Sequence, residues 1–421
     1  MLLRTRVPEG YIQPQPKPDD EIIISMSSGV DSSVTALMYA KKYKNVRGIF
    51  MANWSSDSIG TKQCTAERDW EDVQKICQQI NIPCERVNFE KEYWENVFQP
   101  MIEMYKKGLT PNPDVGCNKY VKFGKMIEHL SKKFEYLDNH NGANNGDDVK
   151  KWWLVTGHYA KVLQNRKTKG YDLMRSDYLP KDQSYYLCQI PENVLSRLLL
   201  PIGHYTKPEV REIAKAYKLA TSEKPDSQGL CFVSQTGKFK DFLNEYIEPN
   251  PGNIVTKDGK IWGKHEGLWY GTIGQRSGIS LPQGNPEYKG IWFISGKNFE
   301  KNELIISKKT DFLEFNKDTI ISNDLNFVHS ERSNNNINEI IENLPPVNEL
   351  TIQFRSLQKP IKLTNLKYDS IKNELTVNLD GKYFGIAPGQ NLVIYHNEKV
   401  ICSSVIISMD NTQESTTLER C

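Results

Sequence analysis

The sequence predicts an α/β fold in which a doubly wound parallel sheet is followed by a small central domain and a C-terminal β-barrel. Three observations support this prediction. Apolar runs typical of buried strands alternate with amphipathic helical runs in the first half of the chain. A loop rich in glycine and serine joins the first of these strands to the first helix. After about residue 250, short β-rich runs appear between turn residues, as in small barrels.

The predicted parallel strands are short and apolar, and they lie at residues 21–25, 46–51, 84–89 and 153–160. The helices between them are predicted at 32–44 and 64–82, and a further helix is predicted at 207–220. Ligands of such sheets bind at the carboxyl ends of the strands. The polar stretches at 138–148 and 333–339 are predicted to be loop insertions.

These patterns divide the chain into four parts. Residues 1–20 contain a Pro/Gln-rich stretch and are predicted to be a flexible extension. Residues 21–223 form the predicted α/β domain, 224–300 the central domain and 301–421 the barrel.

Composition excludes several classes of protein. The formal net charge is +2 over 421 residues, so bulk charge does not indicate a nucleic-acid binder, although a local basic groove remains compatible with it. No apolar run approaches the roughly 18 residues that span a bilayer. The eight cysteines form no CxxC pair, which argues against a zinc finger or a disulfide framework and favours a reducing compartment.

The loop "SMSSGVDSS" at 25–33 follows a strand and opens a helix, which is the setting of an anion site. Gly29 allows close backbone approach, and the serines add hydroxyl donors. Asp31 is unexpected there, because a carboxylate repels phosphate unless it has a partner. The patterns GxxxxGK[ST] and GxGxxG are absent. The alternative is a serine-rich helix cap without a ligand.

Two cysteine segments are candidates for chemistry. In "LTPNPDVGCNKYVKF" at 109–123, Asp114 lies three residues before Cys117, and Cys117 precedes a predicted helix with Lys119 close by. This setting lowers a thiol pKa, and the carboxylate suits proton transfer. In "KPDSQGLCFVS" at 224–234, Cys231 follows a flexible turn at Gly229. The alternative for each is a buried structural cysteine.

The loop resembles the PP-loop of ATP pyrophosphatases, SGGVDSS, with Ser28 where that family usually has glycine. The chain as a whole, from about residue 21 to its end, is similar to the tRNA-specific 2-thiouridylases of bacteria and mitochondria. The matching segments occur in the same order. They are "SSGVDSS", "FMANW", "CTAERDWEDV", "NFEKEYWENVF", "TPNPDVGCNKYVKF", "TGHYA", "KDQSYYL", "DSQGLCF", "YGTIGQR" and "APGQ".

The resemblance implies an ATP-dependent sulfurtransferase that 2-thiolates the wobble uridine of tRNAs for lysine, glutamate and glutamine. ATP would adenylate the base oxygen with release of pyrophosphate, and Mg²⁺ would accompany the phosphates. Met51 would lie beside the adenine, and Gly157 would close the nucleotide pocket. The implied ATP-binding loop consists of Ser27, Ser28, Gly29, Val30, Asp31, Ser32, Ser33 and Val34.

The resemblance also assigns the sulfur chemistry. Cys231 would carry a persulfide, Cys117 would act as the nucleophile that leaves a Cys117–Cys231 disulfide, and Asp114 would be the acid/base partner. The sulfur would reach carbon 2 directly or as hydrosulfide. Asn112, Pro113 and Asp114 would line the target base. The persulfide would come from an upstream donor in a cysteine desulfurase relay.

The tRNA anticodon stem-loop is the implied partner, and no membrane partner is expected. The implied tRNA contacts are His158, Lys181, Asp182, Gln183, Arg355, Ser356 and Gln390. The arginines of residues 1–20 resemble a presequence remnant, and the family works in mitochondria in eukaryotes, so the mitochondrial matrix is the expected location.

Two other functions stay open at this point. A PP-loop ligase of small molecules would need neither Cys117 nor Cys231 and would turn over without tRNA. A non-catalytic tRNA-binding or sulfur-carrier protein with a decayed ATP site would bind tRNA without releasing pyrophosphate. Ser28 is the only feature that favours the second.

Overall fold

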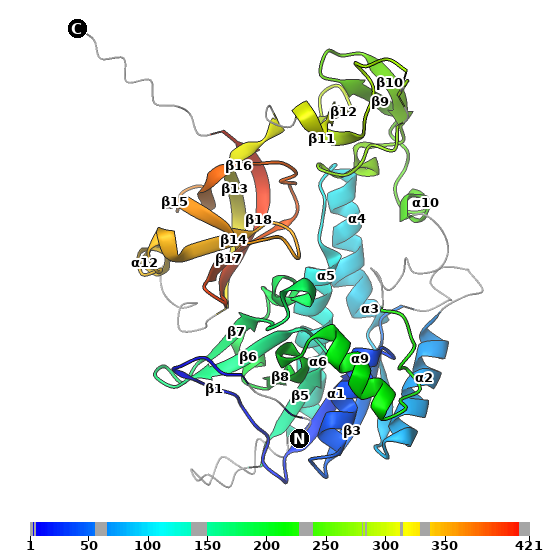
Figure 1. Cartoon of the computed structure of the whole chain (residues 1–421), viewed down its shortest axis with the longest axis vertical. Coiled ribbons are helices and arrows are strands. Elements are labelled where there is room, and N and C mark those ends of the chain that lie inside the picture. Colours follow the sequence, from blue (N-terminus) through cyan, green and yellow to red (C-terminus); the bar gives the residue numbers. More distant parts are fainter. Residues whose placement is uncertain are drawn as a thin grey trace.

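The predicted fold class is confirmed by the computed structural model, in which an α/β domain, a small central domain and a β-barrel follow one another (Figure 1). The structure describes residues 3, 6–54, 65–135, 150–226, 239–279, 281–282, 284–311, 315–328 and 337–411, with only the backbone of 240 and 241.

A five-stranded sheet, parallel throughout, forms the centre of the α/β domain, in the order β4-β3-β2-β5-β8. Its strands are β2 (Glu21–Met26), β3 (Val46–Ala52), β4 (Cys84–Asn88), β5 (Trp152–Thr156) and β8 (Leu198–Leu199). Ile22, Ile23 and Ile24 of β2 are completely buried, as expected for a strand covered on both faces. The chain runs outward from β2 on one side and from β5 on the other. The boundary between β2 and β5 is therefore the switch point where α/β sheets bind ligands.

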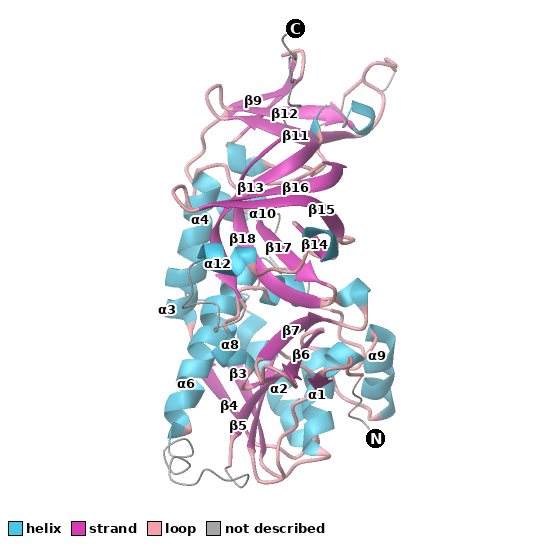
Figure 2. Ribbon diagram, turned by 90° about the vertical axis from the view of Figure 1, so that its left-hand side faces the viewer, coloured by secondary structure: helices cyan, strands magenta, loops and turns pink. Residues whose placement is uncertain are grey.

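Helices cover both faces of this sheet (Figure 2). The regular ones are α1 (Val30–Ala40), α2 (Thr65–Gln79), α3 (Glu90–Tyr93), α4 (Gln99–Lys106), α5 (Pro113–Gly116), α6 (Met126–Lys133), α8 (Glu192–Leu195) and α9 (Lys207–Ala216). Two π-helical segments are η1 (Trp94–Phe98) and η2 (Cys117–Lys125). The 3₁₀ turns that follow are η3 (Leu179–Lys181), η4 (Ser184–Leu187) and η5 (Pro201–His204).

Several predicted elements differ in their bounds from those observed: the helix predicted at 32–44 spans Val30–Ala40, and the helix predicted at 64–82 spans Thr65–Gln79. The strand predicted at 153–160 ends at Thr156, because the chain turns at Gly157 and begins β6 at Ala160. The helix predicted at 207–220 ends at Ala216, and Lys218 beyond it has a left-handed backbone with φ of 50°. A left-handed residue ends a helix by satisfying its last carbonyl groups.

The C-terminal barrel closes through six antiparallel strands, because β17 pairs with both β14 and β18. Its strands are β13 (Lys317–Phe327), β14 (Leu350–Gln353), β15 (Ile361–Asp369), β16 (Glu374–Tyr383), β17 (Asn391–His396) and β18 (Lys399–Asp410). Short helices η9 (Val347–Glu349) and α12 (Ile337–Glu342) flank it. The hairpin of β6 (Ala160–Asn165) and β7 (Tyr171–Arg175) joins the barrel to the α/β domain through pairing between Met174 and Lys399.

The central domain is a four-stranded sheet in the order β10-β9-β12-β11. Its strands are β9 (Gly252–Thr256), β10 (Ile261–His265), β11 (Trp292–Asn298) and β12 (Glu303–Lys308), with short helices α10 (Phe239–Asn244), η6 (Leu268–Tyr270) and η7 (Lys309–Asp311). The helix α4 extends from the α/β domain toward this sheet (Figure 1).

The N-terminal extension differs from the predicted flexible tether where the structure describes it. Strand β1 (Tyr11–Ile12) pairs with β6, and the Tyr11 hydroxyl donates to Asp172 at 2.7 Å. Asp20 is 1% exposed and accepts a hydrogen bond from the Trp153 indole at 2.7 Å. Prolines restrict this segment without preventing packing, because its polar groups find partners on the folded domain.

Among the described residues, no helix is both long enough and apolar enough to cross a membrane.

Candidate active site

The loop between β2 and α1 lies at the switch point of the sheet. The Ser32 hydroxyl donates to the Gly29 carbonyl at 3.1 Å and accepts from the Ser27 N–H at 3.2 Å. The Ser33 hydroxyl donates to the same carbonyl at 2.9 Å. These bonds wrap the loop around the start of α1, where unpaired N–H groups and the helix dipole favour an anion.

Ser28, the departure from the usual PP-loop glycine, adopts a φ of 59°. This left-handed conformation costs a non-glycine residue roughly 1–2 kcal/mol. The Ser28 hydroxyl donates to Asp69 at 2.6 Å and accepts from the Lys224 ammonium at 2.9 Å. Lys224 also pairs with Asp69 and Asp72 at 2.9 and 2.8 Å. The serine is therefore compatible with the loop, because its side chain is anchored.

Asp31 has partners that explain a carboxylate in an anion-binding loop. The Lys207 ammonium, from the first residue of α9, lies 2.7 and 2.9 Å from its two oxygens. The Tyr159 hydroxyl donates to it at 3.1 Å. Lys207 was not predicted as a site residue, because it is 176 residues away along the chain. Its only signal was its position at the start of a helix.

A second carboxylate, Asp226, links this end of the site to a predicted tRNA contact. Lys181 and Lys207 lie 2.8 Å from its oxygens, and Arg211 lies at 2.6 Å. Burial raises the pKa of Asp226, but hydrogen bonds and charge from Lys181 and Lys207 outweigh it, so the pKa lies well below its usual range. Three cations therefore converge beside the PP-loop.

Gly157 and Met51 complete the predicted nucleotide pocket. A Cβ on Gly157 would lie 2.8 Å from the Ser32 nitrogen, so only glycine allows the turn after β5 to lie against the loop. Phe50 of β3 pairs with Met26 of β2, which puts the half-buried Met51 at the same edge of the sheet as Ser27. The structure thus brings Met51, Gly157 and the loop together.

The predicted target-base segment lies where three domains meet. The Gln390 amide of the barrel donates to the Thr110 and Pro111 carbonyls at 2.9 and 3.2 Å. It also accepts from the Asn112 side chain at 3.4 Å. A Cβ on Gly389 would lie 2.9 Å from Thr110 backbone atoms. The barrel backbone at Gly389 therefore packs directly against the backbone of Thr110.

The central domain holds the same segment from its other side. The Lys297 ammonium of β11 donates to the Gly108 carbonyl at 2.7 Å, and Thr272 contacts Thr110 through their hydroxyls at 3.4 Å. Burial lowers the pKa of Lys297 to about 8. Asn112 then caps α5 by accepting from the Val115 N–H at 3.4 Å, with Pro113 at the first helical position.

Asp114 lies in the first turn of α5. Burial raises its pKa, and the positive charge of Lys122 acts in the opposite direction. The charge of the Asp114 carboxylate adds to the raised pKa of Tyr186, of which burial is the main cause. Asp114 therefore has the half-buried, charge-tuned setting typical of a proton-transfer group.

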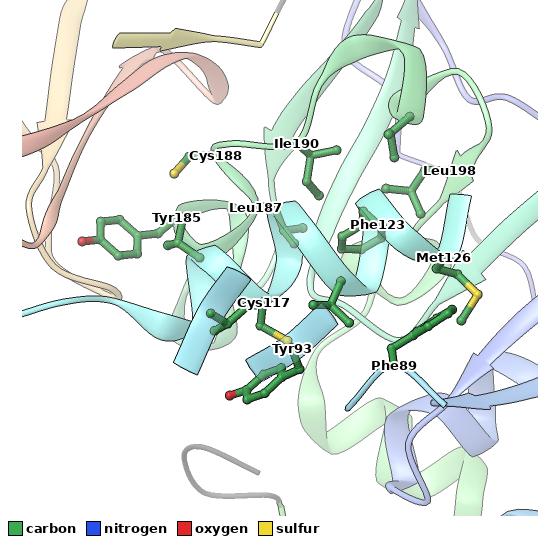
Figure 3. Packing of buried hydrophobic residues seen from close by; sticks show 14 of the residues in the cluster. Phe89, Tyr93, Cys117, Phe123, Met126, Tyr185, Leu187, Cys188, Ile190 and Leu198 are labelled. Atoms are coloured by element: carbon green, nitrogen blue, oxygen red, sulfur yellow. The ribbon is translucent and has the colours of Figure 1, made fainter. Parts of the chain in front are cut away.

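Cys117 is 4% exposed and points into the buried cluster that contains Tyr93 and Phe123 (Figure 3). The helix was expected to begin after Cys117. Instead α5 begins at Pro113 and runs directly into η2, so Cys117 lies one turn inside a continuous helix. Lys119 lies over the Tyr120 ring at 5.1 Å. Cys231 lies outside the described residues.

His158 connects the two ends of the site. It follows Gly157, which contacts the PP-loop, and its ring lies 5.6 Å from the ring of Phe123 on η2. Its Nδ1 is 2.7 Å from the Thr156 hydroxyl. Burial and the charge of Lys122 lower its pKa to about 3, so the imidazole is neutral near pH 7.

The 181–183 segment presents its residues unequally. Lys181 is exposed enough to meet phosphate. Asp182 is 4% exposed and caps its own turn by accepting from Ser176 and Ser184, so a tRNA contact there would come from its backbone. The Gln183 side-chain oxygen accepts from the Tyr159 N–H at 2.9 Å.

Arg355 and Ser356 follow β14 of the barrel and lie near Tyr185 and Tyr186 of the 184–187 turn. The Arg355 guanidinium donates to the Phe384 carbonyl at 2.9 Å, and burial lowers its pKa. Of the predicted tRNA contacts, Gln390 lies directly against residues 110–112, whereas Lys181 pairs with Asp226 beside the PP-loop.

This fold and this loop define the chain as an adenine-nucleotide-binding HUP-domain protein, and comparisons with known proteins agree. Residues 20–235 match the model described as the tRNA methyl transferase HUP domain. Residues 240–308 match the tRNA methyl transferase PRC-barrel domain, and 317–406 the aminomethyltransferase beta-barrel domain.

The curated relatives are more specific. The chain is 46% identical to the mitochondrial tRNA-specific 2-thiouridylase 1 of Saccharomyces cerevisiae, over 93% of each protein. It is 39% identical to the tRNA-specific 2-thiouridylase MnmA of Limosilactobacillus reuteri, over 91% of this chain and 94% of the relative. The chain belongs to the tRNA-specific 2-thiouridylase family.

Proposed function

We propose that this protein is an ATP-dependent tRNA-uridine 2-sulfurtransferase that acts on the wobble uridine of tRNAs for lysine, glutamate and glutamine. One observation carries the proposal. The turn at Gly157–His158 contacts the PP-loop through Gly157 and the Cys117 helix through the His158 ring. A base held at Asn112–Asp114 would therefore lie between a nucleotide site and a thiol.

The first step would join the base to the nucleotide. Oxygen 2 of the uracil attacks the α-phosphorus of ATP, the bond to the β-phosphate breaks and pyrophosphate leaves with its electron pair. Asp114 would accept the N3 proton. Lys207 and the loop N–H groups would hold the phosphates in line for attack.

Among the described residues, no cluster of three metal-ligating side chains occurs. Asp31 is engaged by Lys207 and Tyr159. Mg²⁺ would therefore arrive with the ATP phosphates and neutralise their charge.

In the second step, the terminal sulfur of a Cys231 persulfide forms a bond to carbon 2, and AMP leaves with the oxygen. Cys117 would then attack the Cys231 sulfur–sulfur bond and release the transferred sulfur. The resulting Cys117–Cys231 disulfide would be reopened by a thiol reductant. The sulfur is proposed to come from a cysteine desulfurase relay, and the work to occur in the mitochondrial matrix.

Such a base must leave its stack to reach a thiol that is almost fully buried. The neutral His158, the aromatic Tyr186 and the Asn112 amide suit an unstacked pyrimidine. Lys181 and Arg355 suit the phosphates around it.

A thiolation assay tests this proposal. It contains ATP, Mg²⁺, a persulfide source and unmodified tRNA for lysine, scored by mercury-gel shift. The wild type should shift the tRNA, and Cys117→Ser and Cys231→Ser should not, while Cys188→Ser, at another buried cysteine, should retain the shift. Pyrophosphate released on a small molecule without tRNA, with no shifted tRNA, would instead indicate a ligase.

A further inference from the structure

One carboxylate, Asp226, lies at the centre of the cations beside the PP-loop. The ammonium groups of Lys181 and Lys207 lie 2.8 Å from its oxygens, and the Arg211 guanidinium lies at 2.6 Å. Lys207 and Arg211 are four residues apart on α9, so they lie on one face of that helix. Lys181 comes from η3. Cations from two elements of the fold therefore meet at this single carboxylate.

These cations lie next to the anion-binding end of α1. The Lys207 ammonium is 2.7 Å from an oxygen of Asp31, which is in the first turn of α1, and it is 2.8 Å from Asp226 as well. One ammonium group thus bridges the two carboxylates. The first turn of a helix favours an anion, because its N–H groups are unpaired. The Asp226 carboxylate therefore lies beside the position where phosphates would bind, and it resembles them in charge and in hydrogen bonding.

The side chains of this cluster balance one another in charge. Among the described residues, the closest ion pairs, at 2.6–2.9 Å, join four cations to four carboxylates. The cations are Lys181, Lys207, Arg211 and Lys224, and the carboxylates are Asp31, Asp69, Asp72 and Asp226. A balanced cluster exerts little net attraction on phosphates. Its attraction increases when one carboxylate withdraws.

Asp226 is the carboxylate best placed to withdraw. Asp31 lies in α1, and Asp69 and Asp72 lie in α2, so helical hydrogen bonds hold the backbone of these three residues. Asp226 belongs to no helix or strand, and its side chain is 29% exposed. Rotation of this one side chain toward solvent would release all three of its cations together.

We propose that Asp226 is an internal competitor of the leaving pyrophosphate, whose phosphates and the Asp226 carboxylate bind Lys181, Lys207 and Arg211 in turn. The inference rests on the proposed function, in which ATP loses pyrophosphate beside the PP-loop. Phosphates that bind displace the carboxylate from its cations. After pyrophosphate has formed, the carboxylate returns to the cations and speeds its release. Such a competitor raises the apparent Kd, because only protein with released cations binds phosphates well.

The test is the affinity of the full-length protein for inorganic pyrophosphate with Mg²⁺, measured by calorimetry without tRNA. Asp226→Asn keeps the shape of the side chain and removes its charge. Pyrophosphate should bind this variant about tenfold tighter, as expected if the carboxylate holds the cations about nine-tenths of the time. Asp226→Glu keeps the competing charge and should bind within about threefold of the wild type.

Glu223→Gln is the matched control, because it removes one negative charge three residues earlier on the same segment. The Glu223 side chain is 80% exposed and pairs with Lys215 at 3.4 Å, outside the cluster. Its loss should change pyrophosphate affinity less than about twofold.

The direction of the change decides the proposal. If Asp226 instead organised the cations for the phosphates, its loss would scatter them and weaken binding. Unchanged or weaker pyrophosphate binding by Asp226→Asn would therefore overturn the proposal, as would an equal gain in Asp226→Glu. Damage to the fold cannot imitate the expected gain.

The thiolation assay separates this proposal from the proposed function. Added pyrophosphate should inhibit Asp226→Asn at about tenfold lower concentration than the wild type. Equal inhibition of both proteins would overturn the proposal. Tighter pyrophosphate binding by Asp226→Asn, together with a wild type that thiolates no tRNA, would refute the proposed function alone.

Discussion

The nucleotide end and the base end of this site are built in different ways. The PP-loop is held by residues of the α/β domain and by Lys224 and Asp226, which follow that domain. They act through ion pairs such as Lys207–Asp31. The base segment at 108–114 is held by the barrel through Gln390 and by the central domain through Lys297. ATP binding should therefore be a property of the α/β part of the chain. Base positioning should depend on all three domains.

The largest effect is expected from a substitution at the nucleotide end of the site. Lys207→Met removes the partner of Asp31 and leaves a partly exposed carboxylate beside the phosphates. Breaking a fully buried pair costs about 3–5 kcal/mol, which partial exposure reduces to about 2 kcal/mol here. ATP affinity should fall roughly thirtyfold. Titration with a non-hydrolysable ATP analogue measures this.

Lys215→Met is the control for that change. Lys215 lies on the same helix, is well exposed and pairs only loosely with Glu223 at 3.4 Å. Its loss should change ATP affinity less than about twofold. If both variants bind ATP equally well, the ion pair has no role in holding the nucleotide.

A smaller effect is expected at the base end from Gln390→Ala. The change removes three hydrogen bonds from residues 110–112, each worth about 1 kcal/mol. Misplacement of the base should slow single-turnover thiolation about tenfold. If Gln390 only touched tRNA, the KM for tRNA would rise while the rate at saturating tRNA stayed the same.

Lys297→Met removes the hydrogen bond through which the central domain holds the Gly108 carbonyl, and it should slow thiolation about threefold. It also predicts a pH dependence. The pKa of Lys297 is about 8 in the folded protein and near 10.4 when unfolded. Between these values the unfolded chain binds more protons, so wild-type stability should rise with pH relative to the variant. Melting temperatures of both proteins at pH 7 and pH 10 should show this change; a constant difference would contradict it.

The smallest effect is expected from Ser28→Gly. Glycine relieves the left-handed strain of roughly 1–2 kcal/mol, but it also removes the hydroxyl bonds to Asp69 and Lys224. The two terms nearly cancel, so ATP affinity should change less than about threefold. A gain of tenfold or more would show that the serine weakens the loop.

The same comparison shows what the sequence could predict. The PP-loop and the segment at 109–117 are local motifs, so their residues and their place at strand ends were predictable. The partners that tune them were not, because Lys207 and Gln390 lie 176 and 278 residues from Asp31 and Asn112. The contact of Asp182 with its own turn and the packing of Asp20 under Trp153 were also hidden. Lys119 was the expected cation beside the thiol, whereas the charge that acts on Asp114 comes from Lys122.

The most direct test of the two-part account is the affinity of Gln390→Ala for the ATP analogue in the absence of tRNA, measured on the preparation that is assayed for thiolation. We predict wild-type affinity together with a tenfold slower thiolation. Weakened ATP binding, comparable with that of Lys207→Met, would contradict the claim that the nucleotide end stands independently of the barrel.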